Sequence, residues 1–151
     1  QLFGKYYKGV EGNIIPGLEI FNYYTEAIEN RKKRCIGNIV IEANLNGEKT
    51  KIIGFENHGG QTFDIDTPFG DVLFGNGNKF GDSKEGFFLK NVIATYLHGP
   101  LLSKNPELAD YIIFHCLNRK YNEKIKLEPL NDDFENLCRK QLLDRFINSN
   151  S

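Results

Sequence analysis

The 151-residue sequence contains neither tryptophan nor methionine, and its formal net charge is only −1. A charge this close to neutral gives no electrostatic reason to expect a nucleic acid or an acidic membrane surface as a partner. No apolar run approaches the roughly 20 residues that a membrane-spanning helix needs. We therefore expect a globular protein with no transmembrane segment and no nucleic-acid partner.

Cysteine is also scarce, with three residues at Cys35, Cys116 and Cys138. An odd number without short spacings argues against a disulfide framework and against a cysteine-rich zinc site. The same usage favours a reducing, cytoplasmic location. None of the three lies in the Gly-x-Cys-x-Gly turn that exposes a nucleophilic thiol on an α/β sheet. We therefore expect none of them to be a catalytic nucleophile.

The length fits one domain with its own core. Because the chain begins Gln-Leu-Phe-Gly without an initiator methionine, we expect a piece of a longer protein or a mature product. Asn105 and Pro106 predict the N-cap and first position of a helix. The pattern predicts a helix tail at 1–7, a hairpin turn at 9–18, strands at 18–25, 35–43, 50–55, 72–74, 86–89 and 92–97, and helices near 106–117 and 131–146, the last with a stripe of Phe134, Leu137, Leu142 and Phe146.

His98 is the first candidate for a proton-transfer group. It follows the apolar run 92–97, which reads as a buried strand, and Gly99-Pro100 turns the chain away immediately afterwards. The carboxyl edge of strands in an open α/β sheet is where such proteins bind ligands. A histidine that merely ends a strand and satisfies its own hydrogen bonds is the competing interpretation.

A second candidate segment runs Glu56-Asn57-His58-Gly59-Gly60 at the end of another apolar strand. Residues two apart on an extended chain point the same way, so the carboxylate and the imidazole share a face. The two glycines permit a tight turn and a close approach of the backbone to a ligand. A polar turn with a hydrogen-bonded Glu–His pair, and a metal site formed by Glu56, His58 and His98, are the alternatives.

Two further segments carry polar groups. Arg34 directly precedes a buried strand, so its guanidinium could be held in place for bidentate capture of a carboxylate, although a solvated charged turn over 29–34 is the alternative. The loop 75–83 is rich in glycine and asparagine, but it matches neither a P-loop nor an EF-hand. We expect that loop to be a solvated hairpin.

These segments together resemble the class I glutamine amidotransferases of the cobyric acid synthase-like branch. The resemblance rests on the motifs G-F-E-N-H-G-G-Q-T at 54–62, T-Y-L-H-G-P-L-L at 95–102 and K-N-P-E-L-A-D at 104–110, with support from 1–7 and 35–42. Within the branch, the chain is most similar to glutaminase subunits that serve peptidoglycan synthesis. The resemblance extends over nearly the whole chain up to about residue 118.

The resemblance implies an α/β fold, namely the C-terminal part of a flavodoxin-like amidotransferase domain with β-hairpins and two C-terminal helices. It implies that a cysteine thiolate attacks the side-chain amide of glutamine and that His98 transfers the proton. It places the arginine that holds the substrate's carboxylate at Arg34, with Arg31 as a weaker candidate. Gln1 would be the last residue of the nucleophile motif and would bind substrate together with Arg34. Glu56, His58, Gly59 and Gly60 would line the site.

The sequence departs from the family pattern in two ways. The nucleophilic cysteine would lie four residues before Gln1, so residues 1–151 would form a single partial domain that lacks the N-terminal strands and the elbow. Such a chain is expected to be inactive alone, because losing the nucleophile of a comparable mechanism costs roughly a million-fold in turnover. The residue two after His98 is Pro100, where many relatives have a glutamate, so the group that orients His98 stays unassigned.

The resemblance also implies partners. Ammonia would pass to a Mur ligase-like, ATP-using synthetase that forms a heterodimer with the glutaminase and amidates D-glutamate of lipid II in the cytoplasm. No cofactor or metal is expected on this subunit, whereas ATP and Mg²⁺ are expected on the synthetase. Amidation of a corrinoid by a related enzyme, or a non-catalytic β-rich binding module, are the alternatives.

Overall fold

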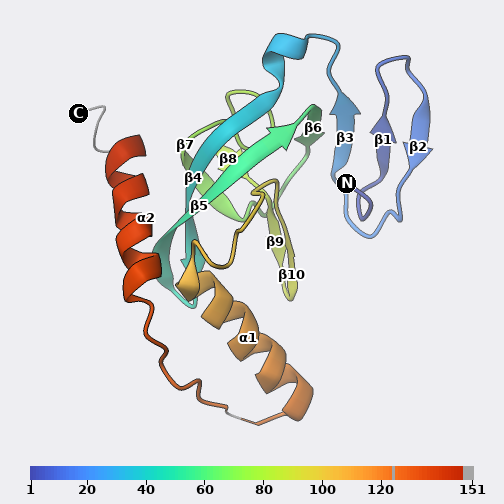
Figure 1. Ribbon diagram of the computed structural model, residues 1–151. Coiled ribbons are helices and arrows are strands. Elements are labelled where there is room, and N and C mark those ends of the chain that lie inside the picture. Colours follow the sequence, from blue (N-terminus) through green and yellow to red (C-terminus); the bar gives the residue numbers. More distant parts are fainter. Residues whose placement is uncertain (124, 148–151) are drawn as a thin grey trace.

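A computed structural model describes residues 1–123 and 125–147 as a mixed α/β structure (Figure 1). Its hairpin-rich strands are followed by two helices at the C-terminal end, which confirms the expected fold class. In chain order the elements are β1 (Tyr6–Lys8), β2 (Ile14–Pro16), β3 (Tyr24–Ala27), the 3-10 turn η1 (Arg31–Lys33), β4 (Cys35–Leu45), β5 (Glu48–His58), β6 (Gly60–Phe63), β7 (Gly70–Phe74), β8 (Lys84–Glu85), β9 (Phe87–Leu89), β10 (Val92–Ala94), α1 (Pro106–Tyr121) and α2 (Asp133–Phe146).

The β4–β5 hairpin is the main support of the fold. Its strands pair without interruption from Cys35 opposite His58 to Leu45 opposite Glu48. Asn46 and Gly47 close it with positive φ angles of 55° and 93°, as a two-residue hairpin turn requires. β7 and β8 extend the sheet in the order β5-β4-β7-β8. The two predicted strands are confirmed, and both are longer than expected.

Each face of this hairpin buries a separate apolar cluster, because side chains alternate along a strand. On one face, Ile39, Ile41 and Ile52 pack with Leu97 and with Leu108 of α1. On the other face, a second cluster joins Val40, Ile53 and Phe146 of α2. The helices accordingly flank the hairpin on different sides (Figure 1).

The N-terminal segment forms a small sheet of order β2-β1-β3-β6. The predicted helix tail at 1–7 is therefore wrong, since residues 6–8 pair in parallel with β3 and antiparallel with β2. The predicted strand at 18–25 is largely wrong too, because regular pairing begins only at Tyr24. Backbone hydrogen bonds from residues 18–21 to residues 2–4 replace it. In both places pairing with distant residues overrides the local pattern.

The predicted buried strand 92–97 is shorter than expected and only half-buried, apart from Leu97. Strand β10 ends at Ala94 and pairs only with β9, in antiparallel fashion. The next backbone donors are bound by side chains, since Tyr96 N–H donates to Glu85 and Leu97 N–H donates to the hydroxyl of Thr95. His98 therefore does not end a strand of an open parallel sheet.

Both C-terminal helices form as predicted, but some of their side chains make other contacts, or are more exposed, than expected. Asn105 occupies the N-cap position of α1 but makes no side-chain capping bond. On α2, Phe146 is buried and Leu142 packs beside it, whereas Phe134 is 81% and Leu137 54% exposed, so the predicted stripe is half wrong. Among the residues that the structure describes, no helix is long and apolar enough to cross a membrane.

Asn105 instead joins α1 to β5. Its side chain is fully buried, accepts from Ile53 N–H at 2.8 Å, and donates to the carbonyls of Ile53 and Leu101. Asn105→Ala leaves these buried backbone groups unpaired, so we expect it to lower the free energy of unfolding by about 2–4 kcal/mol. Urea unfolding measures the change, with exposed Asn38→Ala as the control. A loss below about 0.5 kcal/mol would contradict the structural role of Asn105.

Candidate functional site

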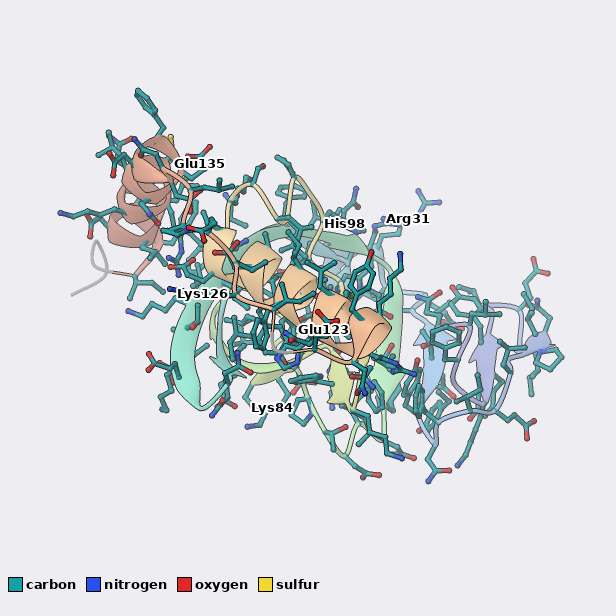
Figure 2. All side chains as sticks on the ribbon, turned by 90° about the horizontal axis from the view of Figure 1, so that it is seen from below. Arg31, Lys84, His98, Glu123, Lys126 and Glu135 are labelled. Atoms are coloured by element: carbon teal, nitrogen blue, oxygen red, sulfur yellow. The ribbon has the colours of Figure 1, made fainter. Side chains whose placement is uncertain are left out.

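His98 lies on the loop between β10 and α1, where its side chain is exposed (Figure 2). Its backbone forms an isolated bridge with Phe55 of β5, in which His98 N–H donates to the Phe55 carbonyl at 2.7 Å. The preceding Leu97 is buried over Gly54, where an added Cβ would lie 2.6 Å from the Leu97 Cβ. The loop is thus anchored on both sides of an imidazole that remains accessible.

Gln1 lies beside the segment that leads to His98. Its side-chain amide donates to the Tyr96 hydroxyl at 3.1 Å, and a Cβ added at Gly60 would come within 2.8 Å of the same amide nitrogen. The Tyr96 hydroxyl also bonds Thr62, which in turn bonds Thr25. The amino end of this chain and the segment before His98 therefore meet.

Glu56 and His58 point to the same side of β5, as predicted, but inward. Glu56 is 1% exposed and accepts hydrogen bonds from the backbone and side-chain amides of Asn76 and from Gly77 N–H. The His58 ring bonds the Gly60 carbonyl through Nδ1 and stacks on Tyr96 with a centroid distance of 3.7 Å. Burial lowers the pKa of His58 below its usual value, so the ring stays neutral near pH 7. Both side chains are buried behind the surface of the site, and their expected role in lining it stays a prediction.

A metal set with Glu56, His58 and His98 is not what the structure assembles. The potential ligand atoms that lie within 4.8 Å of one another belong to Cys35, Glu56 and His58, all buried. Glu56 already accepts three hydrogen bonds, and Cys35 Sγ accepts one from Gln61. Burial raises the pKa of the Cys35 thiol, which disfavours the thiolate that binds metals. We interpret this cluster as part of the polar core.

Arg34 stands at the mouth of an open pocket of about 460 Å³, which Arg31, Gly59 and Gly60 also line. The Arg34 guanidinium donates to the Asn57 side-chain oxygen at 3.2 Å, and an added Cβ on Gly59 would lie 3.5 Å from its Nη1. Arg34 as a whole is exposed to solvent. A guanidinium placed beside a glycine at an open pocket suits bidentate binding of a carboxylate.

The loop 75–83 is more than a solvated hairpin, which corrects the prediction. Asn78 is 3% exposed, donates to the Gly86 carbonyl and accepts from Gly86 N–H. Glu56 binds the same loop from β5. No local pattern in the sequence indicates these contacts, because each joins segments whose proximity depends on the fold.

Sequence analysis also missed Glu85, which is fully buried. Its Oε1 accepts from Tyr96 N–H at 2.7 Å and from the Thr95 hydroxyl at 2.9 Å. Burial raises the pKa of Glu85 to about 7, with a smaller contribution from the charge of Glu56, against the lowering effect of the two hydrogen bonds. Near neutral pH, this carboxyl therefore exchanges a proton inside the fold.

The raised pKa of Glu85 predicts a pH dependence of stability. Between its ordinary pKa of 4.5 and about 7, the native state holds a proton that the unfolded state releases, so stability falls as pH rises through this window. Glu85→Gln should remove that part of the decline. Urea unfolding at pH 5, 6, 7 and 8 compares the two proteins. Parallel stability curves would contradict the raised pKa.

Gly60 lies both against the side-chain amide of Gln1 and in the lining of the Arg34 pocket, and Gln1 bonds Tyr96, two residues before His98. The profile of the CobB/CobQ-like glutamine amidotransferase domain matches residues 1–106. The chain belongs to this family. The matched region contains all of the candidate residues from Gln1 to His98.

Three relatives of this amidotransferase chain carry informative names. It is 42% identical over 147 residues to "Lipid II isoglutaminyl synthase (glutamine-hydrolyzing) subunit GatD" of Staphylococcus aureus, with 96% of this chain and 57% of the relative covered. It is 40% identical over 134 residues to the protein of the same name in Streptococcus pneumoniae, with 87% and 50% covered. It is 30% identical over 138 residues to "Probable cobyric acid synthase" of Methanococcus vannielii, with 87% and 26% covered. The amidotransferase chain thus spans about half the length of the two GatD relatives.

Proposed function

We propose that this chain is the C-terminal, histidine-bearing part of a glutaminase that supplies ammonia for amidation of D-glutamate in lipid II. The observation that carries the proposal is the meeting of Gln1 with the segment that leads to His98. If the nucleophilic cysteine lies four residues before Gln1, that contact brings its end of the chain toward the imidazole. The names of the two most similar relatives reported above support the substrate and the pathway step.

The proposed reaction proceeds through a thioester. The cysteine thiolate attacks the side-chain amide carbon of glutamine, the C–N bond breaks, and His98 donates the proton with which ammonia leaves. His98 then takes a proton from water, the resulting hydroxide cleaves the thioester, and glutamate departs while the thiolate is restored. An exposed imidazole on an anchored loop suits both steps, since it can reach a substrate that enters from solvent.

Arg34 would hold the main-chain carboxylate of glutamine in this scheme. Its free donors, the neighbouring Gly59 and the open pocket provide a cationic place for that group. Glu56 and His58 would act indirectly, because they fix the loop at Asn76–Gly77 and the ring of Tyr96. None of these assignments requires a metal.

The ammonia acceptor would sit on a separate Mur ligase-like, ATP-using subunit in the cytoplasm. The relatives' names describe a subunit of a synthase, which supports a two-component enzyme. The corrinoid alternative has weaker support, because the cobyric acid synthase relative is only 30% identical and this chain spans 26% of its length. We therefore favour lipid II over a corrinoid.

The test uses the full-length protein, with and without a Mur ligase-like synthetase subunit. Incubation with glutamine should release equal amounts of glutamate and ammonia, and addition of ATP and lipid II should yield the amidated product. If the protein binds glutamine without hydrolysing it, the non-catalytic alternative gains support. If glutamine is hydrolysed but only a corrinoid is amidated, the assigned acceptor is wrong.

A further inference from the structure

We propose that Glu85 is a positioning residue that sets the course of the backbone leading into His98. The inference rests on the proposed glutaminase function. Many relatives carry a glutamate two residues after the histidine, and this chain has Pro100 there, so another group must orient the histidine loop. Glu85 would do so indirectly, by binding the backbone of the residues just before His98. Glu85 itself is not expected to touch glutamine.

The backbone of Glu85 is fixed before its side chain makes any contact. Glu85 pairs with Gly70 of β7, and its carbonyl accepts from Phe69 N–H at 2.9 Å. The residue has no exposed surface. Its carboxyl therefore projects from a sheet-bound position and can serve as a rigid reference for a neighbouring loop.

One carboxylate oxygen organises three consecutive residues. Oε1 accepts from the Thr95 hydroxyl and from Tyr96 N–H, while the same Thr95 oxygen accepts from Leu97 N–H at 3.0 Å. These contacts bind two backbone donors that a continuing β10 strand would have offered to a neighbouring strand. The partner strand β9 also begins opposite Ala94, at Phe87, so beyond that point the bonds to Glu85 and Thr95 set the path of the chain.

This path of the backbone positions the residues on either side of Tyr96–Leu97. Leu97 enters the core over Gly54, and the next residue, His98, forms its bridge with Phe55. On the other side, Tyr96 stacks on His58 and receives the hydrogen bond from Gln1. Glu85 therefore supports both the imidazole and the residue that meets the amino end of the chain.

Burial of a carboxyl group such as that of Glu85 lowers the stability of the folded protein unless the group makes hydrogen bonds. An apolar side chain of similar size would avoid the desolvation penalty that burial imposes on Glu85. It could not, however, accept hydrogen bonds from Tyr96 N–H and the Thr95 hydroxyl, which would then stay unpaired. Since errors of about 1 Å in a reacting group can cost about 100-fold in rate, loss of these bonds should affect turnover.

The test compares Glu85→Leu, Glu85→Gln and Thr95→Val in the full-length protein. Leucine removes both acceptor oxygens, whereas glutamine keeps one in the same place. Valine deletes the hydroxyl that links Glu85 to Leu97. We expect Glu85→Leu to lower kcat for glutamine hydrolysis about 10- to 100-fold with KM changed less than about 3-fold. Glu85→Gln should stay within about 3-fold of wild type, and Thr95→Val should lose about 10-fold.

The matched control is Glu42→Gln, which neutralises a partly exposed carboxylate on β4 that pairs with Lys49. This variant should keep wild-type kcat and KM. It shows whether loss of a carboxylate elsewhere on the sheet is enough to alter turnover. A fall in its kcat equal to that of Glu85→Leu would overturn the specific role of Glu85.

Hydrogen exchange provides a readout that does not depend on activity. In Glu85→Leu and Thr95→Val the amides of Tyr96 and Leu97 should exchange faster, while Glu85→Gln should retain their protection. If wild type does not hydrolyse glutamine, the proposed function fails and exchange alone decides the positioning role. If Glu85→Leu does not fold, Thr95→Val decides it. The inference would be overturned if Glu85→Leu or Thr95→Val folds, keeps the wild-type kcat and shows unchanged hydrogen exchange over residues 95–98.

Discussion

His98→Ala in the full-length protein is expected to lower kcat for glutamine hydrolysis by at least about 10²- to 10⁴-fold. The imidazole is proposed to protonate the leaving ammonia and to activate the water that cleaves the thioester. Because the side chain is exposed and its backbone forms the bridge to Phe55, the variant should fold normally. Steady-state release of ammonia measures the effect, and unfolding in urea checks the fold.

His115→Ala is the matched control for that experiment. His115 is a histidine of α1 whose ring bonds the side chain of Asn46, away from the proposed site. Its replacement should leave kcat within about 2-fold of wild type, as expected for a change outside the site. A folded His98→Ala protein with more than about a tenth of wild-type turnover would contradict the assigned role.

Arg34→Ala is expected to raise KM for glutamine about 10- to 100-fold with a smaller effect on kcat. A charged hydrogen-bonded pair contributes about 1.5–3 kcal/mol, and about 1.4 kcal/mol corresponds to tenfold in affinity. Arg34→Lys should recover only part of the loss, because an ammonium lacks the planar fork that binds both carboxylate oxygens. Initial rates over a wide range of glutamine concentration separate KM from kcat.

Arg31→Ala distinguishes the two candidate arginines. Both line the same pocket, but only Arg34 is held by Asn57 and placed beside Gly59 among the contacts of the described residues. We therefore expect the Arg31 variant to change KM less than about 3-fold. The opposite order of effects would show that Arg31 is the carboxylate ligand and that Arg34 only closes the turn.

The sequence patterns that predicted structure correctly are those that need no distant partner. The apolar runs 35–43 and 50–55 predicted two strands, and Asn105-Pro106 with helical spacing predicted a helix. The predictions for 1–7 and 92–97 were wrong or too long, because β1 pairs with β3, and because Tyr96 N–H donates to Glu85 instead of to a neighbouring strand. Local propensity cannot anticipate either contact.

The site shows the same division. His98, Arg34 and Gln1 belong to motifs whose residues are adjacent in the chain, so the sequence alone suggests them as candidates, and their roles stay predictions. The structure adds the contact of Gln1 with the segment before His98. Glu85, Tyr96 and Asn78 were missed, since their importance lies in hydrogen bonds between loops. The alternation of β5 buries Glu56 and His58, a depth that the sequence pattern did not indicate, and their place in the lining of the site stays a prediction.

The most direct test uses the full-length protein and measures, as a function of pH, the alkylation rate of the cysteine that we propose lies four residues before Gln1. The reagent is a glutamine-like electrophile, and mass spectrometry separates this thiol from the exposed Cys116 and Cys138. A neighbouring imidazolium lowers a thiol pKa, so wild type should show a midpoint below about 7.5, and His98→Ala should shift it toward about 8.5. If the midpoint is the same in both proteins, His98 does not face the thiol, and the proposed Cys–His pair is wrong.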